Sequence, residues 1–303
     1  MSAEATCDPT LARERAEPSS LGWRQAKGRI AAVLLAAATG LAVVILAVLL
    51  WSIWSDGRPW LSWGLIRNFP SRKPAQAGMQ PAIWGTLWVV GVTALLAFPV
   101  GVGSAVYLEE YADRRNRWTG LIQTNIANLA GVPSIVYGLL GLGLFVEAMR
   151  LGRSVLAGGL TMALLILPVV IIAAQEAIRA VPPSLREAAY GVGATKWQVS
   201  RDHVLPAAMP GILTGVILAL SRAIGETAPL LVVGASAYVT FNPTGPMSGY
   251  TVVPMQIYEW ARRPQADFSA LAAAAIVVLM VMLLAMNGLA IFLRQRASAK
   301  ARW

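Results

Sequence analysis

Charged residues, cysteine and histidine are scarce in this sequence of 303 residues. Only 13% of its residues are charged and 56% are hydrophobic, whereas soluble domains contain about 25% charged and about 45–50% apolar residues. This composition excludes an ordinary soluble enzyme, and the high apolar content also excludes a disordered chain. The single Cys7 excludes an intrachain disulfide, and it cannot form a zinc cluster with the single His203. We therefore expect no metal site and no cofactor bound by this chain.

A nucleotide-binding loop is also absent. The sequence contains no G-x-x-x-x-G-K-[ST] motif, whose backbone amides cradle the phosphates of ATP. Any ATP that drives this protein must be hydrolysed by another polypeptide, so we expect a protein that is not itself an enzyme.

Long apolar stretches make up most of the chain. They lie at about 30–54, 83–108, 121–146, 157–178, 211–233 and 269–293. Each is long enough to cross a bilayer, which takes about 20 residues, and none shows the two-residue alternation of a membrane strand. The sequence predicts an all-α polytopic membrane protein with six transmembrane helices over residues 29–293. A flexible cytoplasmic tail is predicted at 1–28, and a second cytoplasmic tail at 294–303.

Several of these stretches contain helix-breaking residues. Pro99, Gly131-Val132-Pro133, Pro168 and Pro229 each fall within or near the end of a predicted span. Such breaks release backbone groups that lipid cannot satisfy, so neighbouring protein or a water-filled cavity must do so. A single kink is ordinary, but four interrupted helices favour a bundle arranged around a pathway.

The distribution of lysine and arginine predicts the orientation. With the N-terminus inside, 16 of the 25 basic residues fall on the cytoplasmic side, 8 on the outer side, and Arg222 within a span. Basic residues concentrate in cytoplasmic loops, so both termini are predicted to be cytoplasmic. Trp51 and Trp54 would then anchor the first span at the outer interface.

The predicted cytoplasmic loop at 180–210 contains helix signals of its own. Pro182-Pro183 ends the preceding helix. Ser184 and Glu187 form a capping box that opens a short helix, and Gly191 and Gly193 supply the backbone freedom that ends it. The loop therefore begins with a short helix and a glycine turn.

A second short helix follows in the same loop. Thr195 and Gln198 form another capping box, and this helix is predicted to run to about Leu205, before Pro206. The pair of helices is either a surface hairpin without a partner or a docking element. A smooth face of small residues favours docking into another protein's groove, and its members are Ala188, Ala189 and Gly191.

The spacing of Glu187-Ala188-Ala189, Gly193 and Leu205-Pro206 resembles the EAA loop of ATP-binding-cassette (ABC) importer permeases. In that family the loop inserts into a cytoplasmic ATPase and transmits closure of the ATPase dimer to the membrane helices. By resemblance, residues 183–193 are the coupling helix. The positions that the resemblance assigns to ATPase coupling are Glu187, Ala188, Ala189, Gly193, Leu205 and Pro206. His203 stands where the family usually has isoleucine, either as a tolerated substitution or as a pH sensor.

Three further segments, 128–138, 222–230 and 254–258, are similar to the phosphate-specific permeases of these importers, the PstA type. With the loop, the resemblance covers about 80–293. It implies the six-helix ABC importer permease (MetI-like) fold in a bacterial plasma (inner) membrane. It also implies a PstC-type permease, a PstB-type ATPase dimer that hydrolyses ATP with magnesium, and a PstS-type phosphate-binding protein as partners.

Arg222 and Glu226 are the charged residues predicted deepest in the membrane. Placed four residues apart within the fifth span, they would stack on one helix face near the midplane. An unpaired arginine there costs roughly 2.5–3.5 kcal/mol on insertion scales. The pair is either a structural ion pair or a substrate station, in which the guanidinium fork binds phosphate and Glu226 is the resting counter-ion. Thr227 could add a hydroxyl.

Other polar residues within the spans are weaker candidates for the substrate pathway. Asn125 and Asn128 could line the pathway or bond between helices. Glu176 could line it too, or pair with Arg179 at the interface. The outer segment 234–268 is too polar and broken to span, and could help to dock the binding protein.

Two alternatives to phosphate import follow from the same sequence. The chain could belong to an importer of another oxyanion, such as sulfate or molybdate. It could also be an ion-coupled carrier that acts alone, although a docking loop for an ATPase would then have no purpose. We predict a permease subunit of an ATP-driven inorganic phosphate importer.

Overall fold

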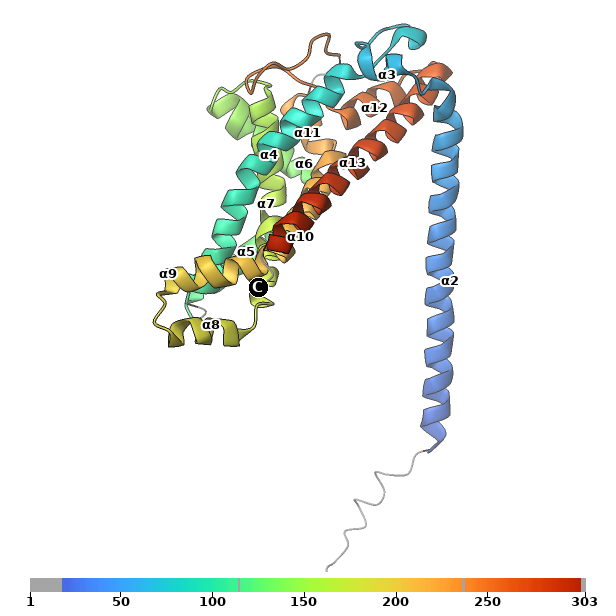
Figure 1. The fold of residues 1–303 in the computed structure, drawn as a ribbon. Helices are drawn as coiled ribbons and strands as arrows, with labels where there is room; N and C mark the ends of the chain where they lie inside the picture. Colours follow the sequence, from blue (N-terminus) through green and yellow to red (C-terminus); the bar gives the residue numbers. More distant parts are fainter. Residues whose placement is uncertain (1–17, 114, 236–237, 301–303) are drawn as a thin grey trace, which may run out of the picture. The chain divides into compact units, whose positions relative to one another are not determined.

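The computed structural model describes residues 18–113, 115–235 and 238–300 (Figure 1). Every regular element within these ranges is a helix, which confirms the all-α prediction. The chain forms two units, Met1–Ile53 and Trp54–Trp303.

The first unit consists of most of one long helix, α2 (Pro18–Gly57). This helix begins inside the segment that the sequence predicts as a tail, while the rest of that tail, 1–17 with Cys7, lies outside the described residues. Its apolar stretch is long enough to span a bilayer. The side chains of this stretch are almost all apolar, as expected for a helix that is surrounded by lipid.

The second unit contains the other candidate spans. Four of its helices are long and apolar enough to cross a membrane, and together with α2 they make five such helices among the described residues. Their cores are α4 (Gln80–Val106), α7 (Val155–Arg179), α10 (Leu205–Gly225) and α13 (Ala266–Lys300). The remaining predicted span, the third at 121–146, is a bent pair made of α5 (Arg117–Ala130) and of α6 (Ser134–Gly141) with its continuation to Ala148, and the two parts differ in direction by 103°.

The predicted breaks differ in severity. Gly131-Val132-Pro133 interrupts the third predicted span completely, between α5 and α6. The fifth breaks after Gly225, and α11 (Ala228–Val233) follows with Pro229 in its first turn. Pro99 and Pro168, in contrast, lie inside continuous helices. Only two of the four predicted interruptions therefore break a span among the described residues, and these two are the candidates for lining a pathway.

These two breaks are packed against each other. A Cβ added to Gly138 of α6 would lie only 2.8 Å from the Cα of Pro229 in α11. Glycine is needed there because it allows the two short helices to approach this closely.

Helix α7 lies at the centre of the second unit, in contact with both α4 and α10 (Figure 1). The Thr93 hydroxyl in α4 donates to the carbonyl of Gly159 in α7 at 3.2 Å. On the other side, Gly215 of α10 packs against Ala173 of α7. Small residues and interhelical hydrogen bonds of this kind hold membrane helices together, since lipid removes the hydrophobic driving force.

Shorter elements cover the two ends of the second unit. The helices of the 180–210 loop, α8 (Pro183–Gly191) and α9 (Lys196–Gln198), lie at one end, and α3 (Trp63–Arg67) and α12 (Val253–Ala261) at the other (Figure 1). The remaining short elements are η1 (Arg58–Trp60), η2 (Pro74–Gln76), and the π-helical η3 (Tyr107–Tyr111), η4 (Leu142–Ala148) and η5 (Val199–Val204). Segments predicted to lie on opposite sides of the membrane are thus found at opposite ends.

Candidate functional site

The short helix α8 has a different N-terminus from the one predicted. It begins with Pro183 in its first turn, and the residue before it, Pro182, makes no side-chain cap. The predicted capping box of Ser184 and Glu187 is wrong, because Ser184 already lies inside the helix. A proline in the first turn needs no cap for its own nitrogen, since it carries no N–H. The glycine turn is confirmed: Gly193 has φ +84°, which favours glycine.

The second helix of the loop is longer than predicted. The capping box of Thr195 and Gln198 is confirmed. The helix does not end before Pro206, however, but continues through α9 and η5 into α10. The π-helical segment η5 ends at Val204, two residues before Pro206, and changes the hydrogen-bond register near the position where the proline lacks its N–H. Leu205 and Pro206 therefore begin a membrane-spanning helix.

Fewer alanines lie on the exposed face of α8 than predicted. Glu187 and Ala188 are exposed, but Ala189 is only 5% exposed and packs in the hydrophobic core. Ala189 is therefore not part of a docking face, which corrects the prediction. The exposed large side chains on this helix are Leu185 and Tyr190. A face with apolar side chains beside one carboxylate remains open for a partner.

The predicted ion pair of Arg222 and Glu226 is present, although its setting differs. The Nε atom of Arg222 lies 3.4 Å from Oε1 of Glu226. Helix α10 ends at Gly225, so Glu226 has extended backbone angles and does not stack on a helix face. The Arg222 side chain is 59% exposed and that of Glu226 is 20% exposed, so this chain does not bury the pair as the sequence predicts. Because Glu226 lies just beyond the end of α10, its carboxylate reaches back along the helix to Arg222.

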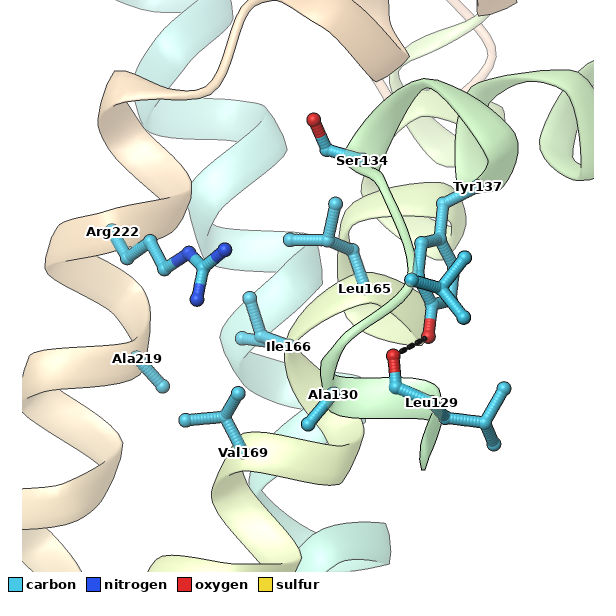
Figure 2. A pocket seen from close by; sticks show the side chains of 10 residues that line it. Leu129, Ala130, Ser134, Tyr137, Leu165, Ile166, Val169, Ala219 and Arg222 are labelled. Atoms are coloured by element: carbon cyan, nitrogen blue, oxygen red, sulfur yellow. Dashed lines mark hydrogen bonds between the residues drawn. The ribbon is translucent and has the colours of Figure 1, made fainter. Parts of the chain in front are cut away.

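A small cavity connects Arg222 with the break in the third predicted span. Figure 2 shows the guanidinium of Arg222 pointing from α10 into this cavity, toward side chains of α7 and of the α5–α6 break. Its volume is about 10 Å³, which is room for a single water molecule. On the far side, the Tyr137 hydroxyl donates to the carbonyl of Leu129 at 2.9 Å across the break (Figure 2). Ser134 and Tyr137 were not among the predicted site residues.

The other predicted pathway residues do not line this cavity. Asn125 and Asn128 lie on exposed positions of α5, where Asn125 Nδ2 donates to the carbonyl of Leu121 in its own helix. Thr227 directly precedes α11. Glu176 lies about 10 Å further along α7 than the cavity-lining Val169.

Glu176 belongs to a separate charged group at the end of the second unit where the 180–210 loop lies. Its carboxylate pairs with Arg179 at 2.9 Å, so the predicted pairing is confirmed. Arg179 also binds Glu109, at 2.6 Å, and Glu109 accepts from Gln175. The sequence signal for Glu109 is its position next to Glu110 at the end of a long uncharged stretch, where two adjacent carboxylates need partners.

Comparisons with known proteins agree with this architecture. Residues 97–299 match the family "Binding-protein-dependent transport system inner membrane component". The chain is 37% identical over 249 residues to "Phosphate transport system permease protein PstA 1" of Mycobacterium tuberculosis (strain CDC 1551 / Oshkosh), covering 79% of this chain and 80% of that protein. It is 34% identical over 286 residues to "Phosphate transport system permease protein PstA" of Yersinia pestis, covering 93% of this chain and 94% of that protein.

Solved structures of ABC transporters share the fold. A bacterial alginate ABC transporter, solved with an alginate-bound periplasmic protein, matches with a TM-score of 0.64 and 17% identity over 91% of this chain and 98% of that chain. An inward-facing MetNI methionine ABC transporter matches with a TM-score of 0.57 and 16% identity over 74% of this chain and 96% of that chain. The predicted MetI-like permease fold is confirmed. The chain belongs to the family of binding-protein-dependent transport system inner membrane components.

Proposed function

We propose that this chain is the transmembrane permease subunit of an ATP-driven importer of inorganic phosphate. The observation that supports this most strongly is its similarity to phosphate permeases over nearly its whole length, at 34% identity across 93% of the chain for the Yersinia pestis protein. In the proposed complex it shares the pathway with a PstC-type permease. A PstS-type protein delivers phosphate, and a PstB-type ATPase dimer hydrolyses ATP with magnesium.

The geometry around Arg222 is suited to a passing anion. Its one ion pair within the described residues is a single contact of 3.4 Å with Glu226, and most of the side chain is exposed. A guanidinium group can form two parallel hydrogen bonds to phosphate oxygens. The contact with Glu226 is made through Nε alone, so the paired geometry is still available to an anion. Glu226 serves as the resting counter-ion and keeps the site from holding the anion too tightly.

The proposed pathway runs between the two broken spans. Because α6 and α11 pack at Gly138 and Pro229, the ends of both breaks lie near the cavity that Arg222 enters. That cavity has room for one water molecule and not for phosphate, so passage of phosphate along the proposed pathway requires the helices around the cavity to separate.

The exposed face of α8 is proposed to dock the ATPase, with Glu187 and Ala188 at its centre. Gly193 sets the turn that presents this face. In the proposed orientation, α8 and both termini of the chain are cytoplasmic. In the proposed complex the ATPase hydrolyses the ATP and this chain does not.

Transport by the reconstituted complex tests the proposal. The chain is placed in proteoliposomes with the candidate partner permease, ATPase and binding protein, and uptake of radioactive phosphate is followed with and without ATP. Phosphate uptake that needs ATP and all partners supports the proposal. Uptake of sulfate or molybdate in preference to phosphate would favour another oxyanion, and uptake by the chain alone would favour an ion-coupled carrier.

A Glu187→Lys variant tests the docking face separately. Co-purification with the ATPase should be lost, because the charge on the exposed face is reversed. Arg201→Glu is the matched control, since Arg201 is 67% exposed in the same loop but lies outside α8. Retained binding in Glu187→Lys would contradict the assignment of the coupling helix.

A further inference from the structure

Helix α8 is attached to the rest of the chain through a narrow inner face. Among its nine residues only Ala189 is buried, and only Arg186 is half-buried. These two residues are three positions apart, so they lie on the same side of the helix. Any displacement of α8 must therefore reach the membrane helices mainly through Ala189, Arg186 and the two chain connections.

Arg186 uses all three of its nitrogens. Nε and Nη2 donate to Oε1 of Glu110, at 3.2 and 2.9 Å. Nη2 also donates to the carbonyl of Ile178 at 2.9 Å, and Nη1 to the carbonyl of Val181 at 2.7 Å. One side chain of α8 thus holds the extension of α4 and the C-terminal end of α7 at once.

A second ion pair lies beside the first. Glu109 and Glu110 are neighbours in η3, the π-helical extension of α4, and their side chains are only 2% and 7% exposed. Glu109 binds Arg179 at the end of α7, while Glu110 binds Arg186. We call these four residues the carboxylate clasp. They line one open cleft of about 450 Å³, into which the side chains can move when a pair opens.

Helix α7 extends from the clasp to the candidate transport site. Leu165, Ile166 and Val169 of α7 line the cavity that Arg222 enters, and Arg179 ends the same helix. A helix of this length is a stiff connection, and packed helices shift between discrete arrangements rather than bending continuously.

We propose that Arg186 is a positioning residue that transmits movement of the coupling helix to α4 and α7 through the carboxylate clasp. This inference rests on the proposed function, because it assumes that α8 receives its movement from an ATPase. Arg186 points away from the exposed docking face, so its role is to pass the movement on and not to bind the ATPase.

The docking and transmission roles predict different failures. If Arg186 only held the loop in shape, its removal would loosen α8 and reduce binding of the ATPase. If it transmits movement, the ATPase still binds and hydrolyses ATP, but less phosphate moves for each ATP consumed.

The test uses the whole complex in proteoliposomes, with Arg186→Met, which keeps an apolar stem and removes the charge. Three quantities are measured: ATPase co-purification, ATP hydrolysis and phosphate uptake. We expect co-purification to be unchanged and the ratio of ATP hydrolysed to phosphate transported to rise about fivefold or more, the lower end of usual coupling strengths. Arg201→Met removes a loop arginine whose one ion pair in the described part of the chain is with the adjacent Asp202 at 3.7 Å, and it should change nothing.

Glu110→Gln provides a second variant with nearly the same shape, in case Arg186→Met does not assemble. It keeps one acceptor for Arg186 and removes the charge, so the ratio should rise in the same direction, and the double variant should add little to the larger single effect. An unchanged ratio in Glu110→Gln, or loss of ATPase binding in parallel with uptake, would overturn the inference. A wild-type complex that moves sulfate or molybdate instead of phosphate would contradict only the proposed substrate, since the ratio is then measured with that anion.

Discussion

Replacement of Arg222 by glutamine separates the two interpretations of the Arg222–Glu226 pair. The pair is joined by one contact of 3.4 Å, and the arginine side chain is 59% exposed. Exposed ion pairs contribute about 0–1 kcal/mol to folding. Arg222→Gln should therefore change the free energy of unfolding by less than about 1 kcal/mol.

The expected effect on transport is much larger. A hydrogen bond to a charged group contributes about 1.5–3 kcal/mol. At 1.4 kcal/mol for each factor of ten, loss of one such bond to phosphate lowers uptake by roughly 10- to 150-fold. Arg222→Lys should fall between glutamine and the wild type, because lysine keeps the charge and loses the planar fork.

Uptake and thermal unfolding are measured on the same preparations of the complex. Arg201→Gln is the control, as its loop position lies outside both candidate sites. Wild-type uptake by Arg222→Gln at normal expression would refute the substrate role. A loss of stability well above 1 kcal/mol with uptake preserved would instead show that the pair is structural.

Three further predictions concern the backbone and the buried outer segment. Gly193→Ala forces a side chain into φ +84°, which costs about 1–3 kcal/mol, so co-purification with the ATPase should weaken. Gly85→Ala would drive a Cβ into the carbonyl oxygen of Thr251, so the yield and melting temperature of the folded chain should fall. Burial raises the pKa of Tyr250, so the folded protein opposes ionisation that the unfolded chain undergoes near its ordinary value of about 10. This contribution to stability is complete below that pH and is lost as the pH rises, so the unfolding midpoint of Tyr250→Phe should fall less steeply above about pH 10.

Each of these predictions has a matched comparison. Gly120→Ala is the control for the turn, since Gly120 lies in α5 outside the 180–210 loop, has ordinary backbone angles and has no packed neighbour within 4 Å of the added Cβ. Gly91→Ala lies on the same helix as Gly85 but has no packed neighbour within 4 Å of the added Cβ, so it should leave the melting temperature unchanged. Equal effects of the two substitutions in either glycine pair would contradict the steric reasoning. If the unfolding midpoints of the wild type and of Tyr250→Phe fell equally steeply above about pH 10, the pKa argument would be contradicted.

The sequence predicts the number and place of the apolar helices well, because length and composition alone determine which segments can cross a membrane. It also predicts the break at Gly131-Val132-Pro133, where glycine and proline coincide. The effect of a single proline is harder to predict. Pro99 and Pro168 remain inside helices, whereas the fifth span breaks before Pro229, at Glu226 and Thr227. Whether a helix bends around a proline or ends beside it depends on packing against neighbours, which the sequence does not state.

The candidate site is only partly predictable for a similar reason. Spacing correctly brings Arg222 to Glu226 and Glu176 to Arg179, since both pairs are local. Long-range partners such as Glu109 with Arg179 are separated by 70 positions and have no spacing rule. Ala189 illustrates the limit on a single helix: its neighbours are exposed, but only the fold determines which face is turned inward.

Several charged groups within the apolar part of the second unit lie where helical regularity ends or changes. Glu226 follows the end of α10, Glu109 and Glu110 lie in a π-helical turn, and Arg179 is the last residue of α7. Unpaired backbone groups and charged side chains both need polar partners or water, so one wet, irregular point satisfies both. Such points are also where a helix can change direction at low cost. From the cavity at Val169 to Arg179 the distance along α7 is about 15 Å of regular helix. We therefore expect movement to be concentrated at the two ends of this stretch, where ATPase and substrate would act, and to be transmitted without deformation between them.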